Sequence, residues 1–498
     1  MNGGLGILVG LLPAVMLAGG ASLCAAIAVA RPWTLASLYR WIALLSTVGA
    51  FVASMLELAA MTHNPSGVGQ VSFGGGLMID RFHVFGTVLV CAVLALTVLG
   101  AQAYLRRAPT RAGAVCALLL LSAAASAMLL AQREMAAFTI DLALLITCLV
   151  LLTAITKTSS VTAEAAFRQV LSGGIALATA VYGLVLVYAA TGTTDLSRLA
   201  TGFRVNGTRV DPVLSVVGIC LVVFGLLILV GAPPLQAWIR HLHEAAPGPI
   251  AGFSSALGVV TGSAVLARYA VEGFGTGSSR WTILVDVLAV VAMLSGGILA
   301  IRASTIRRLI ADLSIVQGGF LLLAVTATAK GISGQAGAGP TALLYALMGA
   351  ATSLVAALLL AGIFDAAGLG TSIDAYRGVG RRAPTTAGFL ALALLALAGL
   401  PPLAGFIARL LIAEAALDAG AGWVVAAAAV AVTLCGVALF GWLSAMYAED
   451  ENQAPFAVTT TPLVSRVTAW SAAALGLLLA AFAGPLLSLA GGSATALH

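Results

Sequence analysis

Six polar side chains in this sequence have the types and the placement that proton transfer inside a membrane requires. They are Asp141, His243, Asp312, Gln317, Arg409 and Glu414. Carboxylates and imidazole exchange protons when their surroundings shift their pKa, whereas an arginine stays charged and sets the pKa of a neighbour. All six lie in or beside long apolar runs, where a charged side chain is costly and marks function. The six groups are scattered along the sequence, and water can connect such groups across the gaps between them.

The composition excludes a soluble fold. Of the 498 residues, 61% are hydrophobic and 8% are charged, and the mean hydropathy is +1.09. A soluble domain carries about 25% charged residues. The chain is therefore predicted to be an all-α polytopic membrane protein in contact with the lipid bilayer. Its net charge of +6 forms no basic stripe, so no nucleic-acid partner is expected.

Neither a catalytic centre nor a cofactor is expected in this chain. The six cysteines lie in apolar runs without a CxxC pair, which is typical of packing residues. HExxH, phosphate-loop, dinucleotide-binding and nucleophile-elbow motifs are all missing from the sequence. We therefore expect no metal, no cofactor and no redox centre held by these residues.

A membrane-spanning helix needs about 20 mainly apolar residues, and the sequence contains fourteen such segments. The first is interpreted as a spanning helix and not as a cleaved signal, because no basic segment precedes it. The predicted spans are 4–30, 39–61, 83–105, 112–132, 135–157, 165–191, 212–234, 249–272, 281–301, 306–329, 340–364, 384–411, 422–447 and 464–490.

The distribution of basic residues predicts the orientation. Counting loops from the N-terminus, the odd-numbered loops hold fifteen of the 24 Lys and Arg residues, and the rest of the chain holds nine. Basic loops stay in the cytoplasm. Both termini are therefore predicted to be extracytoplasmic, in a multi-pass protein of the cell inner (plasma) membrane. Between the second and third spans, residues 70–80 alternate around glycines, which fits either a small extracytoplasmic hairpin or a flexible loop.

Two proline pairs interrupt apolar spans, Pro233-Pro234 in the seventh and Pro401-Pro402 in the twelfth. The flanking sequences VGAPPLQAW and AGLPPLAGF are similar, and the two spans must cross the membrane in opposite directions. Matching broken helices in two inverted units indicate a transport path. Spans 4–8 and 9–13 would form two inverted five-helix repeats. The predicted division is 1–110 for spans 1–3 with the hairpin, 111–272 and 281–447 for the two repeats, and 448–498 for the last helix.

Three segments carry a family resemblance. The segment WIRHLHEAAPGP from Trp238, the segment LAGLPPLAGFIAR ending at Arg409, and RRLIADLSIVQGGF from Arg307 resemble motifs of the antiporter-like proton-conducting subunits. Those subunits occur in respiratory complex I, group 4 membrane-bound hydrogenases and Mrp sodium/proton antiporters. The motif Tyr376-Arg-Gly is similar to the complex I members nearest the peripheral arm. The resemblance covers roughly residues 70–450.

The resemblance also shows where this chain departs from the family. It implies a glutamate in span 5, where Asp141 stands, and a lysine or glutamate in span 12, where Arg409 stands. The lysine positions of spans 7 and 8 correspond to Leu229 and Val260. Arginine stays protonated, so Arg409 is expected to act as a fixed charge and not as a proton donor. The first half therefore lacks its two central titratable groups.

Several of the candidates have simpler interpretations. Asp141 fits an ordinary interfacial aspartate as well as a proton carrier. Asp312 either replaces a lost group or caps the start of the tenth span beside Arg308. Two histidines two residues apart on a helix point in different directions, so they cannot share a metal, and the family motif favours His243 over His241. Arg409 and Glu414 could each form an ion pair with another helix.

Three functions are consistent with the sequence. The preferred one is a proton-translocating subunit of a redox-driven respiratory complex, of NADH-quinone oxidoreductase or membrane-bound hydrogenase type, with other membrane subunits as partners and protons (possibly Na⁺) as the moved ion. One alternative is a subunit of an Mrp-type cation/proton antiporter. The other is a degenerate scaffold subunit that does not pump, which the missing lysines favour.

Overall fold

The computed structural model describes residues 3–30, 36–62, 70–72, 75–156, 159–199, 212–274, 279–331, 338–449, 458 and 461–497. Four of the basic residues used to predict the orientation lie outside these ranges: Arg31, Lys157, Arg204 and Arg209. Most of the glycine-rich segment 331–339 also lies outside them.

Helices account for nearly all of the described residues, as the apolar runs predict. The first three spans are α1 (Gly3–Ala30), α2 (Ala36–Thr62) and α3 (Arg81–Gly100), followed by α4 (Gln102–Arg107) and one 3₁₀ turn (Pro109–Arg111). The next group is α5 (Ala112–Ala131), α6 (Met135–Ile155), α7 (Ser160–Thr191), α9 (Pro212–Val230), α10 (Ala237–Ala245) and α11 (Gly248–Arg268). A π-helical turn at Tyr269–Gly273 extends α11.

The second half repeats this order of long helices. It comprises α12 (Ser279–Ile301), α13 (Ile306–Lys330), α14 (Ala338–Ala366), α15 (Val379–Arg382), α16 (Pro384–Ala398), α17 (Ala404–Asp418) and α18 (Gly422–Tyr447). The chain continues with α19 (Leu463–Ala481), α20 (Ala483–Ala494) and a 3₁₀ turn (Thr495–Leu497).

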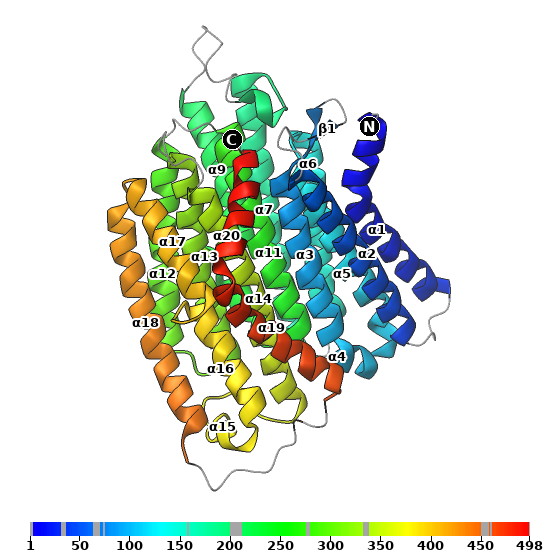
Figure 1. Cartoon of the computed structure of the whole chain (residues 1–498), viewed down its shortest axis with the longest axis vertical. Coiled ribbons are helices and arrows are strands. Elements are labelled where there is room, and N and C mark those ends of the chain that lie inside the picture. The colour runs from blue at the N-terminus through cyan, green and yellow to red at the C-terminus, as the bar shows by residue number, and fades with distance from the viewer. Residues whose placement is uncertain are drawn as a thin grey trace.

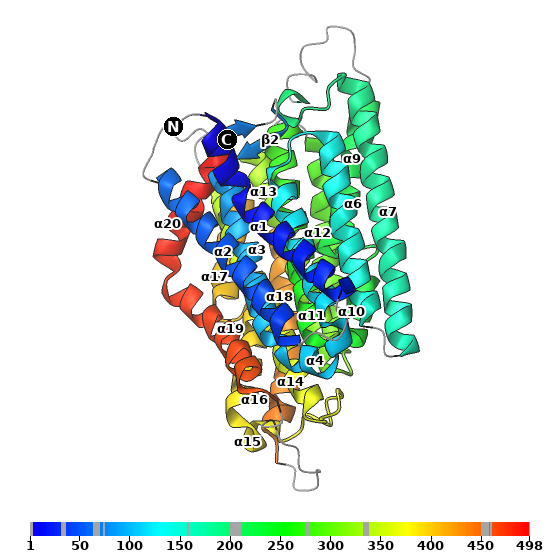
Figure 2. The same cartoon turned by 90° about the vertical axis from the view of Figure 1, so that its right-hand side faces the viewer.

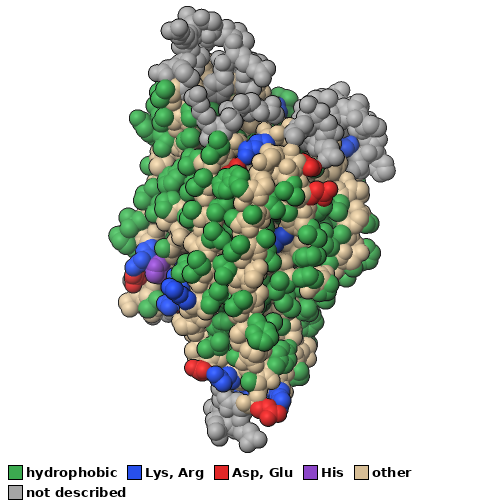
Figure 3. All heavy atoms as spheres, turned by 90° about the vertical axis from the view of Figure 1, so that its left-hand side faces the viewer, with side chains coloured by type: hydrophobic (Ala, Val, Ile, Leu, Met, Phe, Trp, Pro, Cys, Tyr) green, Lys and Arg blue, Asp and Glu red, His purple; other side chains and the backbone are tan. Residues whose placement is uncertain are grey.

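Thirteen of the described helices are long and apolar enough to cross a membrane, and α16 is a shorter apolar helix that continues into α17 beyond a break. This arrangement confirms an all-α polytopic membrane fold. The start of α1 and the end of α20 lie at the same end of the bundle, called here the terminal face, and the opposite end is called the distal face (Figure 1). Apolar side chains cover the middle of the visible surface in Figure 3, and charged side chains gather mainly toward the two ends.

The helices form a bundle with two fully enclosed members. The apolar windows of α11 and α13 are 100% buried, whereas those of α1, α7 and α18 are each 33% buried. The remaining helices surround this pair, with α7 along one edge of the molecule and α19 and α20 along the opposite edge (Figure 2). Polar groups on α11 and α13 are therefore shielded from lipid by protein.

Two local features refine the sequence prediction. Residues 70–80 contain an antiparallel hairpin of β1 (Gln70–Ser72) and β2 (Leu77–Ile79), so the hairpin interpretation is confirmed over a plain loop. The predicted fourteenth span is two helices, α19 and α20, and not one. Pro485 has no N–H to donate to the carbonyl of Ala481, which lies four residues before it, so the helical hydrogen-bond ladder is interrupted there.

Candidate functional site

The two helix breaks share one backbone geometry. Pro233-Pro234 and Pro401-Pro402 both have a cis peptide bond, and each pair is preceded by a glycine with positive φ, Gly231 at 84° and Gly399 at 66°. In a left-handed conformation glycine avoids the steric penalty that other residues incur. Each break therefore ends its helix in the same way.

The hydrogen bonds at the two breaks also correspond. The N–H of Gly231 donates to the carbonyl of Ile228 and that of Ala232 to Leu227, at 3.1 and 2.9 Å. The N–H of Gly399 donates to Ala396 and that of Leu400 to Leu395, at 3.1 and 3.0 Å. This is the two-bond helix ending that commonly surrounds a left-handed glycine. α9 runs away from the terminal face and α16 runs toward it, so one motif occurs twice in opposite directions (Figure 1).

The two breaks differ in the side chain that donates to a carbonyl at the end of the helix. In the first, the indole Nε1 of Trp238 donates to the carbonyl of Ile228 at 3.0 Å. In the second, Nη2 of Arg409 donates to the carbonyl of Leu397 at 3.1 Å. A neutral donor therefore serves the first break and a permanent cation serves the second. The two halves share a backbone but differ in electrostatics.

Arg409 is a buried cation without a carboxylate partner among the described residues. Arg409 is 4% exposed. Its guanidinium lies 4.3 Å from the ring centre of Phe320 on α13. Nε and Nη1 have no hydrogen-bond partner in the described part of the chain. The cation is stabilised by the aromatic face and by one carbonyl, which leaves donors available for another group.

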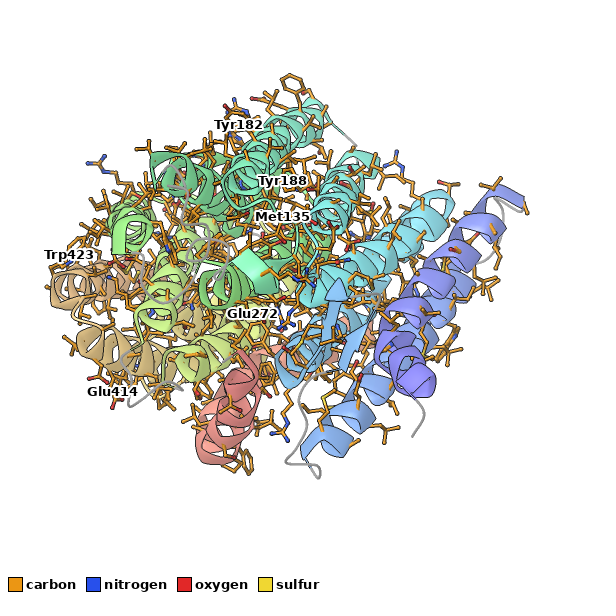
Figure 4. The ribbon with its side chains drawn as sticks, turned by 90° about the horizontal axis from the view of Figure 1, so that it is seen from above. Met135, Tyr182, Tyr188, Glu272, Glu414 and Trp423 are labelled. Carbon is orange, nitrogen blue, oxygen red and sulfur yellow. The ribbon has the colours of Figure 1, made fainter. Side chains whose placement is uncertain are left out.

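Glu414 does not join this site. It is exposed, and it lies at the outer edge of the bundle when the molecule is seen from the terminal face (Figure 4). Five residues along an α-helix correspond to a rotation of about 140°, so Arg409 and Glu414 face in different directions. The described residues show no ion pair for either side chain.

Asp312 is a fully buried carboxylate near the start of α13. Nε of Arg240 on α10 lies 2.9 Å from its Oδ1, and Nη2 of Arg240 lies 3.2 Å from its Oδ2. Asp312 does not cap the helix, because Thr305 does so by accepting from the N–H of Arg308 at 3.2 Å. The carboxylate therefore links α13 to the helix that follows the first break.

α13 carries polar groups at several levels between the two faces of the bundle. Asp312 and Gln317 are both buried, but five residues apart they face different sides of the helix. Phe320 then lies against the Arg409 guanidinium, and the helix ends at partly exposed Lys330. Nζ of Lys330 lies 2.5 Å from Oδ2 of buried Asp286 on α12. At 1.5 Å per residue, Asp312 and Lys330 are about 27 Å apart along the helix axis, so these levels extend over most of a bilayer core of about 30 Å, with Phe320 about 12 Å from Asp312.

At the distal face, the two predicted histidines occupy different environments. His241 lies near the surface, with Nε2 at 2.9 Å from Nη1 of Arg168. His243 is fully buried, and its Nε2 lies 2.7 Å from Oγ of Ser255 on α11. The apolar part of the seventh span ends before α10, and here burial lowers the pKa of His243 to about 3, with the nearby Arg307 charge acting in the same direction. His243 is therefore neutral at neutral pH.

Further ion pairs near His243 were not predicted from the sequence. Nη1 of Arg307 donates to the carbonyls of His243 and Ala246, each at 2.6 Å, while its Nη2 pairs with Asp365 at 2.5 Å. Arg308 pairs with Glu244. Arg307 and Asp365 are 58 positions apart, so no local pattern connects them. The only signal in the sequence is the pair of adjacent arginines, Arg307 and Arg308, at the start of the tenth span, which indicates that acidic partners lie nearby.

The first half has an apolar centre where the family has lysines. Leu229 and Val260 are both buried. Leu229 borders a cavity of about 30 Å³ whose lining includes Ile146, Gln169 and Trp238. The polar contacts beside these two residues include hydroxyl links, such as that between Ser126 and Thr261 at 2.5 Å. These hydroxyls can relay hydrogen bonds but do not hold a charge near neutral pH.

Asp141 lies away from this apolar centre. Its Oδ2 accepts from Nε2 of Gln132 at 2.7 Å, and the residue is half-buried near the terminal face. The structure thus gives Asp141 a neutral partner. No basic side chain is paired with it among the residues described.

A second network of ion pairs lies in the first half at the terminal face. Arg268, at the end of α11, pairs with Asp80 and with Glu272, each at 2.8 Å, and Glu272 also pairs with Arg133 at 2.7 Å. Asp80 in turn accepts from the N–H of His83 at the start of α3. Arg268 and Asp80 are each 1% exposed, and Glu272 lies toward the centre of the bundle in Figure 4. Sequence reasoning missed this network because its members come from three separate segments.

The described residues contain no group of three or more His, Cys, Asp and Glu side chains that could hold a metal ion. The residues named above can exchange protons, relay hydrogen bonds and compensate charge.

These features define a class of protein. Residues 132–435 match the family model described as NADH:quinone oxidoreductase/Mrp antiporter, transmembrane, and the chain belongs to this family. Among its relatives is NADH-quinone oxidoreductase subunit N 2 of Rhizobium meliloti, 30% identical over 85% of this chain and 86% of that protein. NADH-quinone oxidoreductase subunit N of Myxococcus xanthus is 29% identical over 79% of each chain.

Solved structures share the fold. A chain of the membrane-bound sulfane sulfur reductase, an archaeal respiratory membrane complex, is similar with a TM-score of 0.84 and 22% identity, over 97% of each chain. A chain of the Mrp complex from Dietzia sp. DQ12-45-1b is similar with a TM-score of 0.82 and 17% identity, over 99% of this chain and 97% of that one. The fold of this chain thus occurs both in a respiratory membrane complex and in an Mrp complex.

Proposed function

We propose that this chain is a proton-translocating subunit of a redox-driven respiratory complex of the NADH-quinone oxidoreductase type. Its relatives named subunit N support this choice of complex. The observation that carries the proposal is the set of charged groups on or against α13 at three levels of the core, namely the Arg240–Asp312 pair, Arg409 of α17 against Phe320, and the Lys330–Asp286 pair. Buried charges in a membrane protein are costly to keep, so charges at successive levels of the core support a role in moving charge.

The proposed path lies in the second half. Asp312 would accept a proton at the distal end, where loosening of its contact with Arg240 favours the neutral acid and tightening favours the carboxylate. Gln317 would orient bridging water, because an amide both donates and accepts. Arg409 would act as a fixed charge midway along the path, and the Lys330–Asp286 pair would form the other end.

The first half would contribute differently. Its central positions are Leu229 and Val260, while the charged Arg268–Glu272–Arg133 network lies at the terminal face and neutral His243 lies at the distal face. We propose that this half supports the second mechanically and does not carry a charged intermediate through its centre. Asp141 would act at the terminal face, and Glu414 is left without a role in the path because of its exposure.

The remaining parts of the proposal concern the setting of the chain. The matching breaks support two inverted units, proposed as 111–272 and 281–447, flanked by 1–110 and 448–498. Orientation with both termini outside the cytoplasm rests on the distribution of basic residues. We place the protein in the plasma membrane, with lipid and other membrane subunits as neighbours and with protons, or Na⁺, as the transported ion.

The decisive experiment is to purify the complex through a tag on this chain and reconstitute it in liposomes. NADH and a soluble quinone would drive the reaction, and a pH-sensitive dye would report protons moved per electron. The variant Asp312→Asn should lower that ratio while electron transfer continues. The matched control Asp374→Asn changes an exposed aspartate paired with Arg377 at 3.2 Å, and it should leave the ratio unchanged.

The scaffold function is the second candidate, and Leu229 and Val260 are the observations that favour it. An unchanged ratio of protons to electrons in both Asp312→Asn and Arg409→Met would establish a scaffold and overturn the proposal. Recovery of the chain with no redox subunits, together with sodium-dependent proton exchange in liposomes, would instead establish an Mrp-type antiporter.

A further inference from the structure

A cavity of about 210 Å³ lies at the distal face, between elements of both halves and the last part of the chain. Its walls come mainly from α4, the start of α11, the start of α13, the end of α14 and the start of α19. α4 and the start of α19 lie close together at this face (Figure 1). Neither Arg240 nor Asp312 lines the cavity, so it is not part of the proposed proton path.

Two arginines line this cavity, and only one of them is neutralised by a carboxylate of the lining. Nε and Nη2 of Arg307 both donate to Oδ2 of Asp365, at 2.9 and 2.5 Å, so this pair has no net charge. Arg107 makes one long hydrogen bond, 3.4 Å from its Nη2 to the carbonyl of Ala366, and it pairs with no carboxylate among the described residues. With two arginines and one aspartate as its charged members, the lining is positive by one charge.

Two helices begin beside the cavity, and neither has a side-chain cap. Gly248, the first residue of α11, lies in the lining. α19 begins at Leu463, between the lining residues Thr461 and Ser465. The first N–H groups of a helix have no partner within the helix, and the helix dipole is positive at this end. Both helix ends therefore add to the positive charge of Arg107, and such an environment favours an anion.

A buried hydroxyl group in the lining has no hydrogen-bond partner. Ser465 is 3% exposed, and its Oγ makes no hydrogen bond with any described residue. A buried polar group is costly to leave unsatisfied, so this hydroxyl indicates an occupant. Oδ1 of Asp365 is also buried and without a partner in the described part of the chain. An occupant that satisfies both groups carries a hydrogen-bond acceptor and a hydrogen-bond donor.

We propose that this cavity binds a phosphate group, carried either by the headgroup of an anionic phospholipid or by a free phosphate ion. Phosphate oxygens accept from the Arg107 guanidinium, from the Ser465 hydroxyl and from the first N–H groups of α19. The hydroxyl of a protonated phosphate, or of a glycerol headgroup, donates to Oδ1 of Asp365. Water alone would satisfy the Ser465 hydroxyl but would leave the positive charge of Arg107 and of both helix ends uncompensated. Basic pockets between membrane helices are suited to such groups.

The test uses the whole complex, purified through a tag on this chain and exchanged into a neutral detergent. Equilibrium dialysis measures the binding of inorganic phosphate, and native mass spectrometry measures the binding of phosphatidylglycerol. Diacylglycerol, which has the same acyl chains and no phosphate, is the control lipid and should bind more weakly. A lipid headgroup as the source predicts tight binding of phosphatidylglycerol alone. A free ion as the source predicts saturable binding of inorganic phosphate to the lipid-free complex.

Two variants remove the proposed contacts, each with a matched control. One arginine near an anionic group contributes a factor of about five, so Arg107→Gln should weaken binding about fivefold. Arg302→Gln removes the same charge from an exposed position outside the lining and should leave the affinity unchanged. Ser465→Ala removes a hydrogen bond to a charged group and should weaken binding about tenfold. Ser471→Ala removes an exposed hydroxyl of the same helix and should have no effect.

A third variant should increase the affinity. Asp365→Asn keeps an oxygen that accepts from Arg307 and removes the one negative charge that opposes a phosphate, so binding should become several-fold tighter. A residue that only supports the fold would not give such a gain. Phosphatidylglycerol binding no tighter than diacylglycerol, together with no saturable binding of inorganic phosphate, would overturn the proposal. Equal affinities in Arg107→Gln and Arg302→Gln, and in Ser465→Ala and Ser471→Ala, would also overturn it.

Discussion

Replacement of Arg409 by methionine tests whether this side chain matters for proton translocation without being needed for the stability of the protein. The change removes a charge-assisted hydrogen bond to the Leu397 carbonyl and a cation–π contact with Phe320. These contribute about 1.5–3 kcal/mol and about 2 kcal/mol respectively in buried settings. The change also removes the cost of burying an unpaired ion, which amounts to several kcal/mol.

The two contributions nearly cancel, so Arg409→Met should change the free energy of unfolding by less than about 2 kcal/mol. A thermal shift assay on the complex in detergent would measure this quantity. In liposomes, the same variant should lose most proton translocation while electron transfer persists. Arg409→Lys keeps the positive charge and should retain part of the translocation.

Two results would refute this reasoning. If Arg409→Met prevents assembly of the complex while Arg409→Lys assembles normally, the cation is a structural element of the break and no conclusion about transport is justified. If Arg409→Met assembles and moves as many protons per electron as the unmodified protein, Arg409 has no part in the path.

Three further predictions follow from buried groups. Arg268→Met should lower the free energy of unfolding by about 3–5 kcal/mol, because it leaves Asp80 buried and unpaired; an unchanged melting temperature would contradict this. Gly399→Ala should lower the free energy of unfolding by about 1–2 kcal/mol and impair translocation, because a Cβ at this positive φ would overlap the Arg409 guanidinium. Gly388→Ala is the control, because a Cβ there would meet open space. Leu229→Lys should destabilise the fold by at least about 2 kcal/mol, since it buries an ammonium group in an apolar centre, and normal stability would show that water reaches this position.

The parts of the fold that depend on local sequence were predictable. Apolar length located the spans, and the proline pairs located the two breaks, because proline removes a backbone donor wherever it occurs in a helix. The paired glycines Gly231 and Gly399 lie two residues before each pair, so the likeness of the two backbones could also be read from the sequence.

The site was less predictable because its contacts join distant segments. Arg240 and Asp312 are 72 positions apart, and Arg268 and Asp80 are 188 apart, so no periodic pattern connects them. Glu414 was grouped with Arg409 because both lie beyond the second break. Their five-residue spacing already turns them to different sides of a helix, and the structure adds that Arg409 is on the buried side and Glu414 on the exposed side. The environment of His243 depends on α11 and Arg307, which lie outside its own motif.

The position of Arg409 about halfway along α13 has an electrical consequence. A membrane potential of 100 mV is worth about 2.3 kcal/mol for one elementary charge that crosses the whole field. A proton travelling from the level of Asp312 to that of Lys330 would cross about 27 Å of a core about 30 Å thick, so it would feel almost the full voltage. A swing of the Arg409 side chain by about 3 Å would feel about a tenth of it, roughly 0.2 kcal/mol. Voltage therefore opposes or drives the moving proton while it leaves the resident arginine nearly undisturbed.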